Sequence, residues 1–350
     1  MMWPLNTTRS RIGIDLSGKC IRAVQLAGHG PDPRVQAVAS IPRTDVEAPL
    51  AERDARRLFD VLNRQSFTGI DLVVGIPDAM LGTAIIRTQR VGSALTRDRS
   101  IREEFAKSCA LDPSGSEIAY WELPTPSRGD KTSDVMAVGC AHDDADSLLD
   151  AAERAGFRIA ALDVACAAIA RWSTCLPDLA CMSAVLDLEW ESAGVVVIYQ
   201  ETVVYERSIP EAGLKALYHD IKSRTRLNDE MLDLLLRDVG LRGEETASAP
   251  PDGLVSIRPA ITDHLDRMID ELKMALSYVE HQYQEDEIAE MHLIGDGARI
   301  VGLPEYLAER LDMNIRSTAL AQIATCPTAL EDLCASSAPA KALGYALHPG

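Results

Sequence analysis

The sequence predicts an α/β protein whose two similar lobes face one another across a cleft, with a smaller α+β subdomain inserted into the first lobe. Three observations predict this fold class. A series of hairpin, third strand, helix and further strand occurs twice along the chain. Asp15 and Asp187 stand at equivalent points of the two repeats, where the first strand meets its turn. The last strand of the second repeat runs into a glycine turn and a helix within Met291–Leu311, MHLIGDGARIVGLPEYLAERL.

Composition and charge limit the classes of function. The 350 residues are 47% hydrophobic and 25% charged, as in a soluble globular protein with one bilobed unit or two domains. The net charge is −18 and no cluster of Lys and Arg stands out, which excludes nucleic acid as a partner and disfavours anionic lipid. The apolar runs are too short for a membrane span, and Met1–Arg11 lacks the apolar core of a signal peptide. We therefore expect a cytoplasmic protein whose eight cysteines are reduced thiols.

The first repeat begins with alternating apolar residues. A strand is expected over residues 11–16, a turn at residues 17–19, a returning strand over 20–26 and a third strand over 35–41. A helix over about residues 51–65 and a strongly apolar strand over 71–76 follow, and Pro77 ends that strand.

The second repeat has the same order. Strands are expected over residues 183–188, 193–199 and 203–209, with turns at 189–192 and 201–202, and then a helix over about 213–225. An insertion over about residues 226–285 holds one helix at about 228–239, a polar loop at 243–253 and a long helix at 263–284. The strand over residues 291–294 completes the unit, and a short helix at 338–347 closes the chain.

The segment between the repeats differs from both. Residues 86–156 contain a helix at about 94–110, an apolar strand at 135–140 and a helix at 145–155, and we interpret them as an inserted subdomain that contacts a partner protein. A small-residue helix over 161–172 is expected to join the lobes. The predicted division is residues 1–85 with 157–182 for the first lobe, 86–156 for the insertion and 183–350 for the second lobe.

The two hairpins are candidates for forming a nucleoside triphosphate site with Mg²⁺. Their turns offer backbone N–H groups to phosphate oxygens, and the carboxylates of Asp15 and Asp187 suit a metal ion, directly or through water. The glycine turn lets a flat ligand lie close to the backbone at the end of a strand. Each aspartate or glycine alone is more often an ordinary turn residue. The candidate nucleotide-binding residues are Asp15, Ser17, Gly18, Lys19, Asp187, Glu189, Gly213, Gly295, Gly297 and Ala298, with Asp15 and Asp187 also as metal ligands and no catalytic residue assigned.

Five segments in this order resemble the PilM family, actin-like cytoplasmic proteins of type IV pilus assembly and relatives of the division protein FtsA. They are IGIDLSGKCIRAVQL, LVVGIPDAMLGTAIIR, AVLDLEWESAGVVVIYQ, LIGDGARIVGLPEYLAERL and AKALGYAL, and they span nearly the whole chain, from about residue 11 to 347. The resemblance implies an actin/Hsp70-like duplicated (RNase H-like) two-lobed fold with ATP in the cleft. It also implies a partner, the short cytoplasmic tail of a PilN-like membrane protein, which ties the protein to the inner membrane.

Two residues depart from the Asp-x-Gly pattern of the family's hairpins. Ser17 and Glu189 stand where glycine is usual, although Gly18 keeps the first turn feasible. At a separation of about 5 Å and an effective dielectric of about 20, a repelling charge pair costs about 3 kcal/mol, which weakens binding by about two decades. A Mg²⁺ ion bound by Glu189 would reverse that sign. The sequence leaves ATP binding open and indicates that fast hydrolysis is not expected.

Three functions are consistent with this fold. The first is a scaffold of a pilus-type inner-membrane assembly, with self-association possible and nucleotide used, if at all, to set the lobe angle. The second is a small-molecule kinase of the same superfamily, for which Asp78 is the candidate catalytic residue. The third is an FtsA-like filament former, which the absence of a basic amphipathic helix at Ala346–Gly350 disfavours.

Overall fold

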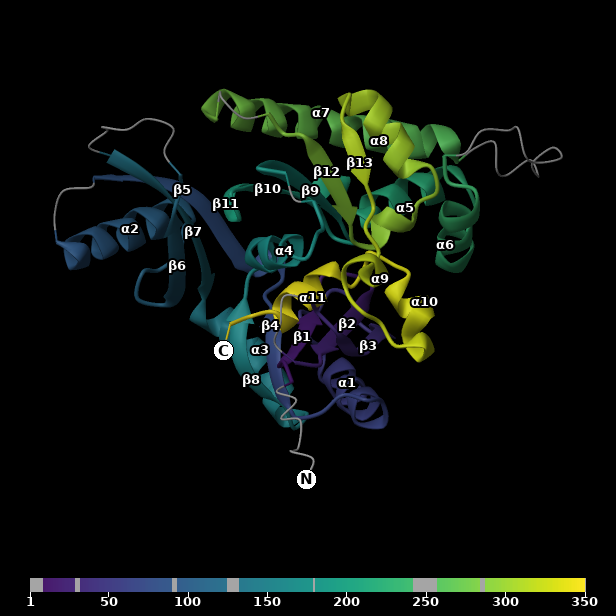
Figure 1. The fold of residues 1–350 in the computed structure, drawn as a ribbon, viewed down its shortest axis with the longest axis horizontal. Coiled ribbons are helices and arrows are strands. Elements are labelled where there is room, and N and C mark those ends of the chain that lie inside the picture. Colours follow the sequence, from purple (N-terminus) through teal and green to yellow (C-terminus); the bar gives the residue numbers. More distant parts are fainter. Residues whose placement is uncertain are drawn as a thin grey trace.

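The computed structural model describes residues 9–28, 32–89, 93–124, 132–178, 180–241, 257–283 and 287–349. Three sheets organise these residues, two of five strands and one of three (Figure 1). The polar loop expected at residues 243–253 lies outside the described residues. The two large sheets belong to the two lobes, and the third sheet lies to one side of them (Figure 1).

The sheet of the first lobe has the strand order β3-β2-β1-β4-β8. Its elements are β1 (Ile12–Asp15), β2 (Cys20–Leu26), β3 (Val35–Pro42), α1 (Glu52–Arg64), β4 (Asp71–Gly75) and β8 (Arg158–Asp163). β1 pairs antiparallel with β2 and parallel with β4, so that Gly13 lies between Val24 and Val73. The short 3-10 helix η1 (Asp78–Met80) follows β4. The apolar residues of this sheet pack against Leu58 and Leu62 of α1.

The sheet of the second lobe repeats this order as β11-β10-β9-β12-β13. Its strands are β9 (Met182–Leu188), β10 (Ala193–Tyr199), β11 (Thr202–Ile209), β12 (Glu290–Ile294) and β13 (Asn314–Arg316). Its helical elements are η2 (Pro210–Ala212), α5 (Leu214–Arg224), α6 (Asp229–Asp238), α7 (Arg258–Gln282), η4 (Asp296–Arg299) and α8 (Leu303–Leu311). Because position for position the two sheets have the same topology, the predicted duplicated fold class is confirmed.

The third sheet is formed by residues between the two repeats of the sequence and lies at one side of the lobes (Figure 1). It contains β5 (Leu81–Gln89), β6 (Ser116–Glu122) and β7 (Thr132–Ala141) in the order β5-β7-β6, with α2 (Ala94–Ser108) against it. Ile101 and Phe105 of α2 form its core with Ile118. The next helix, α3 (His142–Arg154), instead places Leu148 in the core of the first lobe. The third sheet thus begins at Leu81, before the predicted boundary of the insertion at residue 86, and α3 contributes to the core of the first lobe. The division of the chain into domains stays an interpretation.

Two helices lie between the lobes, α4 (Ala165–Ser173) and α11 (Ala340–Ala346), and Figure 1 shows them side by side near the centre of the molecule. The expected helix over residues 161–172 was wrong at its start. Residues 158–163 form β8 instead, because Ala161 and Leu162 pair in parallel with Val73 and Val74 of β4. Pairing with a neighbouring strand overrides the helical preference of the alanines.

The remaining elements close the second half of the chain. They are α9 (Leu320–Ile323), η5 (Thr328–Leu330) and α10 (Glu331–Cys334).

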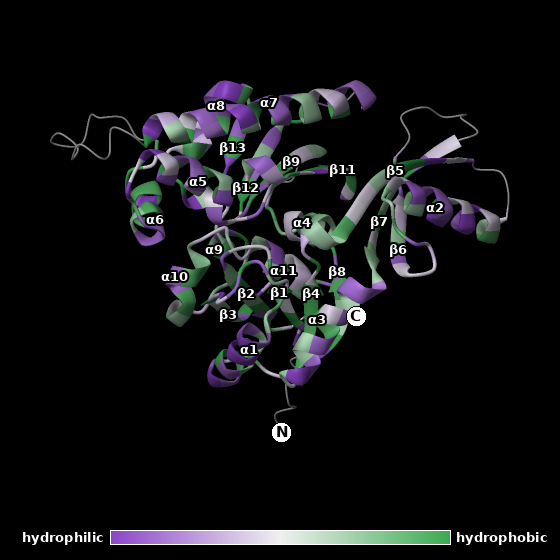
Figure 2. Ribbon diagram, turned by 180° about the vertical axis from the view of Figure 1, so that it is seen from behind, coloured by the Kyte–Doolittle hydropathy of each residue, from purple (hydrophilic) through white to green (hydrophobic). Residues whose placement is uncertain are grey.

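Hydrophobic residues are concentrated on the strands, whereas the outer helices α1, α7 and α8 carry many hydrophilic residues (Figure 2). Each of the eight cysteines is a free thiol, as expected. Within the described ranges, the helices are each too short or too polar to cross a lipid bilayer.

Candidate functional site

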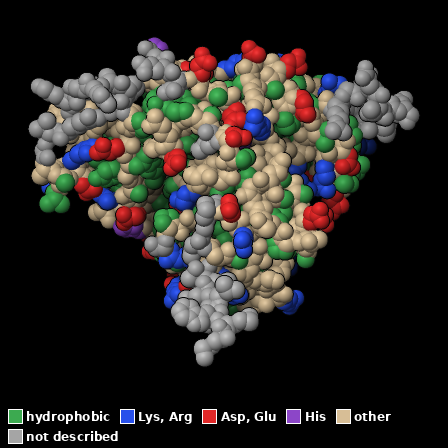
Figure 3. All heavy atoms as spheres, viewed as in Figure 1, with side chains coloured by type: hydrophobic (Ala, Val, Ile, Leu, Met, Phe, Trp, Pro, Cys, Tyr) green, Lys and Arg blue, Asp and Glu red, His purple; other side chains and the backbone are tan. Residues whose placement is uncertain are grey.

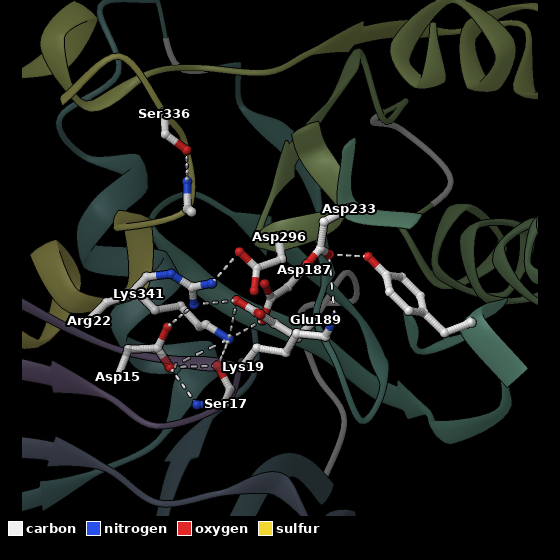
Figure 4. Close-up of polar contacts among 12 residues, drawn as sticks. Asp15, Ser17, Lys19, Arg22, Asp187, Glu189, Asp233, Asp296, Ser336 and Lys341 are labelled. Carbon is white, nitrogen blue, oxygen red and sulfur yellow. Dashed lines mark hydrogen bonds and ion pairs between the residues drawn. The ribbon is translucent and has the colours of Figure 1, made fainter. Parts of the chain in front are cut away.

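The two repeated aspartates meet at the centre of the molecule, where β1 and β9 end. Asp15 is the last residue of β1, and Asp187 is the residue before the end of β9. Both carboxyl groups face the same ammonium group, that of Lys341: Nζ lies 2.6 Å from Asp187 Oδ2 and 3.8 Å from Asp15 Oδ1. The paired placement expected from the repeat therefore forms, but around a lysine that the sequence analysis did not identify (Figure 4).

Lys341 reaches this position because α11 lies directly on β1. A Cβ atom at Gly13 would lie 2.1 Å from the carbonyl oxygen of Ala342, so only glycine permits this contact. Lys341 is in the first turn of α11 and is 2% exposed. Its Nζ also lies 2.5 Å from Ser17 Oγ and 3.4 Å from Glu189 Oε1, so the ammonium is surrounded by oxygen atoms of both hairpins.

A second buried cation, Arg22, lies beside the first. It is the third residue of β2 and is also 2% exposed. Its Nη1 lies 3.2 Å from Asp15 Oδ2 and 3.1 Å from Glu189 Oε1, and its Nη2 lies 2.5 Å from Asp296 Oδ1. Arg22 thus links the hairpin of the first lobe to the hairpin and the glycine turn of the second (Figure 4). We call Asp15, Arg22, Asp187, Glu189, Asp296 and Lys341 the cleft ion cluster.

The charges of the cluster raise the pKa of both cations and shift the pKa values of its carboxyl groups in different directions. Burial alone would raise the pKa of Asp15, but Lys341 and Arg22 hold it below its ordinary value. Burial raises the pKa of Glu189 to about 8 and also raises the pKa of Asp187, because the cations offset only part of the desolvation. The surrounding carboxyl groups keep the pKa of Lys341 and of Arg22 well above their ordinary values despite burial.

The two hairpin turns are closed by side chains of the protein itself. The Asp15 carboxylate accepts hydrogen bonds from the backbone N–H of Ser17 at 3.1 Å and from its hydroxyl at 2.5 Å. A Cβ atom at Gly18 would lie 2.8 Å from Glu189 Oε2 and 2.9 Å from an Arg22 nitrogen, so these groups cover the turn. The second hairpin closes through the N–H of Glu189, which donates to the carbonyl of Ser192 at 3.0 Å.

Lys19 is turned away from the cluster. Its Nζ lies 4.2 Å from the ring centre of Trp190, 4.0 Å from that of Tyr218 and 3.3 Å from Asp233 Oδ1. The Tyr218 hydroxyl donates to the same carboxylate of Asp233. Lys19 therefore binds an aromatic and acidic surface of the second lobe.

The remaining candidate residues pack against β9 and its turn. Gly295 has a φ of +84°, and a Cβ atom there would lie 2.6 Å from the carbonyl oxygen of Leu188. At Gly297 it would lie 2.2 Å from Leu188 Cγ, and at Gly213 it would lie 2.5 Å from the backbone of Glu191. Ala298 is partly buried against the core of the second lobe. The close approach that these glycines permit is therefore an approach of the protein to itself.

A cavity of about 230 Å³ opens beside the glycine turn. It is smaller than the roughly 300 to 1,000 Å³ of ligand clefts in general. It is lined by Lys19, Cys20, Leu214, Tyr218, Asp233, Leu236, Arg237, Asp296, Arg299 and Ile300. Of the cleft ion cluster it reaches only Asp296, so it ends before the buried charges.

A magnesium ion at Asp15 and Asp187 does not fit this arrangement. Within the described ranges, three or more carboxylate, histidine or cysteine side chains do not come together as a metal site. The Lys341 ammonium lies between these carboxylates. At about 4 Å from it, a divalent cation would be repelled by about 8 kcal/mol at an effective dielectric of about 20, which offsets its attraction to one carboxylate at the same distance. Asp187 Oδ1 and Glu189 Oε2 lack a hydrogen-bond partner in the described part of the chain, but they face the Gly295 and Gly18 backbone.

Three members of the cluster carried a signal in the sequence. Arg22 interrupts the apolar strand IRAVQL, Lys341 is the single charge of AKALGYAL, and Asp296 stands inside the glycine turn. A lone charge within an apolar segment indicates a buried, paired group. The partner of each could not be found from this signal.

Comparisons with known proteins agree on the fold. The structure of a PilM-PilN type IV pilus biogenesis complex is similar over 97% of this chain and 98% of its own, with a TM-score of 0.78 and 18% sequence identity. The ethanolamine utilization protein EutJ of Carboxydothermus hydrogenoformans follows, with a TM-score of 0.55, 14% identity and coverage of 100% and 93%. MreB5 of Spiroplasma citri bound to ADP has a TM-score of 0.52, 11% identity and coverage of 96% and 95%. No family model matches the sequence, and no curated protein matches it. The chain therefore has the actin-like fold that its motifs imply.

Proposed function

We propose that this chain, whose actin-like fold superposes on PilM along almost its full length, is a cytoplasmic scaffold of a type IV pilus or related inner-membrane assembly. The observation that carries the proposal is the TM-score of 0.78 with PilM, against 0.55 with EutJ and 0.52 with MreB5. The solved relative is a complex of PilM with PilN. By analogy, the partner is the cytoplasmic tail of a PilN-like membrane protein, which holds the scaffold at the inner membrane.

The third sheet supplies the proposed contact surface for that tail. A small groove of about 50 Å³ lies between it and α7, where Ile85 is 39% and Tyr278 48% exposed and Leu123 and Val204 are buried. Asp134 and Gln282 are polar residues of its lining. β5 pairs with β7 on one side only in the described sheet. An extended peptide can add to such a strand edge, and apolar side chains beside the edge give it affinity. Figure 3 shows hydrophobic side chains gathered over this part of the molecule.

The binding experiment uses the full chain and a fluorescent peptide with the sequence of the PilN-like cytoplasmic tail from the same genome. Saturable binding is expected. Changing Tyr278 to Asp should weaken it at least tenfold, which corresponds to about 1.4 kcal/mol, because a charge then faces the apolar side chains of the groove. The matched control is Leu95→Asp. Leu95 is 84% exposed, belongs to the helix α2 that packs on the same sheet, and lies outside the groove. No binding by the unmodified chain, or equal loss in both variants, would contradict the proposal.

The kinase alternative depends on Asp78. Its carboxylate accepts a hydrogen bond from Ser192 Oγ at 3.2 Å, across the two lobes. This hydrogen bond gives Asp78 a structural role between the two lobes. A residue with that role and no other supports the scaffold and not the kinase.

ATP with Mg²⁺ stays a prediction for this chain. Its support is that MreB5, which has the same fold, was solved with ADP and with AMPPNP. The internally paired charges of the cleft ion cluster count against it. The scaffold proposed here binds its partner through the third sheet and does not depend on the nucleotide.

A further inference from the structure

The ammonium of Lys341 lies where the repeat predicts a metal ion. Its Nζ is 2.6 Å from Asp187 and 3.8 Å from Asp15, the two residues predicted to hold Mg²⁺. It also lies 2.5 Å from the hydroxyl of Ser17. This cation pairs with one oxygen atom of each of the two carboxylates that a metal ion would bind, and Asp187 Oδ1 has no hydrogen-bond partner in the described part of the chain.

The space over the hairpin turns is filled as well. Glu189 Oε2 and the Arg22 guanidinium cover Gly18, and Arg22 extends from there to Asp296 in the glycine turn. The neighbouring cavity of about 230 Å³ does not reach Asp15, Asp187 or Lys341. Phosphate groups would have to displace these paired side chains from a site in which both cations are 2% exposed.

The cluster joins elements of both lobes. Asp15 and Arg22 belong to the first sheet and Asp187 to the second, Glu189 lies in the turn after β9, Asp296 begins η4, and Lys341 belongs to the helix between the lobes. We infer that Lys341 takes the place of the metal ion, and that Glu189 paired with Arg22 takes the place of the phosphate groups, in an actin-like cleft. The two lobes are then held together by the chain's own charges without nucleotide.

The inference concerns the cleft alone and is independent of the partner proposed for the third sheet. Its first test is on the unmodified full chain. Calorimetric titration with Mg²⁺-ATP is expected to give no binding heat, and the unfolding midpoint is expected to be the same with Mg²⁺-ATP, with Mg²⁺ alone and without either. Saturable binding, or a rise of the midpoint with ligand concentration, would overturn the inference, since a ligand of the folded state must stabilise it.

The second test exchanges the internal cation for a free one. Lys341→Ala leaves Asp15 and Asp187 buried without their shared cation and opens room beside them. The variant is expected to unfold several degrees below the unmodified chain, and millimolar Mg²⁺ without nucleotide should restore part of that loss. The unmodified chain should show no such response to Mg²⁺.

Lys215→Ala is the matched control. Lys215 lies at the cleft with its side chain 44% exposed and forms ion pairs with Glu47 of the first lobe and Glu191 of the second. This exposed interlobe pair should change the midpoint little and give no response to Mg²⁺. A Lys341→Ala chain as stable as the control, or one that Mg²⁺ fails to stabilise, would refute the placement of Lys341 at the metal position.

The test remains decisive if Lys341→Ala does not fold. Lys341→Met keeps most of the side-chain volume, so its loss of stability reports the charge and not a cavity. Lys341→Arg keeps the charge and should recover more of the unmodified midpoint than Lys341→Met does. The reverse order would show that packing of α11, and not its cation, holds the lobes.

Discussion

At the residue scale, buried carboxyl groups outside the cleft ion cluster also set the response of the protein to pH. Glu206 of β11 is half-buried, and burial together with the nearby Asp78 raises its pKa to about 7, although Thr83 donates a hydrogen bond to it. An acid whose pKa is higher in the folded than in the unfolded state binds its proton more tightly when folded. Its contribution to the free energy of unfolding is therefore fully present below about pH 4.5 and is lost as pH rises to about 7.

Replacing Glu206 with Gln should remove this pH dependence. The amide has a similar shape and carries no charge at any pH. Above about pH 7 the variant should be more stable than the unmodified chain by on the order of 2 kcal/mol, and at about pH 4.5 the two should be nearly equal. Urea unfolding across this pH range measures the difference. Glu201→Gln, at an exposed position on the neighbouring turn, is the control and should leave the pH profile unchanged.

At the element scale, the crossing of α4 and α11 determines where Lys341 lies. A Cβ atom at Gly344 would lie 2.0 Å from the carbonyl oxygen of Ala168 and 2.5 Å from its carbonyl carbon. Both of these atoms belong to the backbone of α4, so the clash cannot be relieved by a rotation of a side chain. The distance between the two helices, and with it the reach of Lys341 toward Asp187, depends on this glycine.

Gly344→Ala should therefore destabilise the protein by about 1–3 kcal/mol, because overpacking forces the helices apart. The expected result is a lower urea midpoint with an unchanged dependence on urea concentration. Gly194→Ala is the matched control. A Cβ atom at Gly194 would have its nearest neighbour at 3.9 Å, which is ordinary contact, so this variant should lose much less stability. Equal effects in the two variants would mean that α11 is free to shift on α4.

At the scale of the whole molecule, one core is shared by both lobes. Val24 and Leu26 of the first sheet belong to the same apolar cluster as Val185 and Ile294 of the second, together with Trp172 of α4. The third sheet has a separate cluster around Phe105. Lobes that share a core cannot unfold one at a time without exposing it.

Hydrogen exchange in increasing urea should report this coupling. Peptides from β2 and from β12 are expected to give the same free energy of opening, because Val24 and Leu26 of β2 and Ile294 of β12 belong to the shared core. Peptides from α2 serve as the internal comparison, because Ile101 and Phe105 of this helix belong to the separate cluster of the third sheet, and they should exchange at equal or lower urea. A first lobe that opens at clearly lower urea than the second would contradict the shared core.

Local patterns were sufficient for most of the elements. β2 (Cys20–Leu26) and β10 (Ala193–Tyr199) have the bounds that the sequence analysis expected, because alternating apolar residues and turn residues are local signals. The same signals did not identify β8, where alanines typical of a helix pair with β4. They also missed β5 and β6 of the third sheet, and β13, which is only three residues long. A strand whose partner supplies its stability has little pattern of its own.

By itself, the sequence determined the duplicated two-lobed fold and the placement of Asp15 and Asp187 at the cleft. Both follow from a pattern of apolar and turn residues that occurs twice along the chain. The tertiary structure alone decided what those aspartates bind. Lys341 is separated from Asp187 by 154 residues and from Ser17 by 324, and no pattern within one segment encodes such pairs. The packing of α11 on Gly13 and on α4 brings this cation between the two hairpins, because only contacts between distant segments fix where a helix at the end of the chain lies.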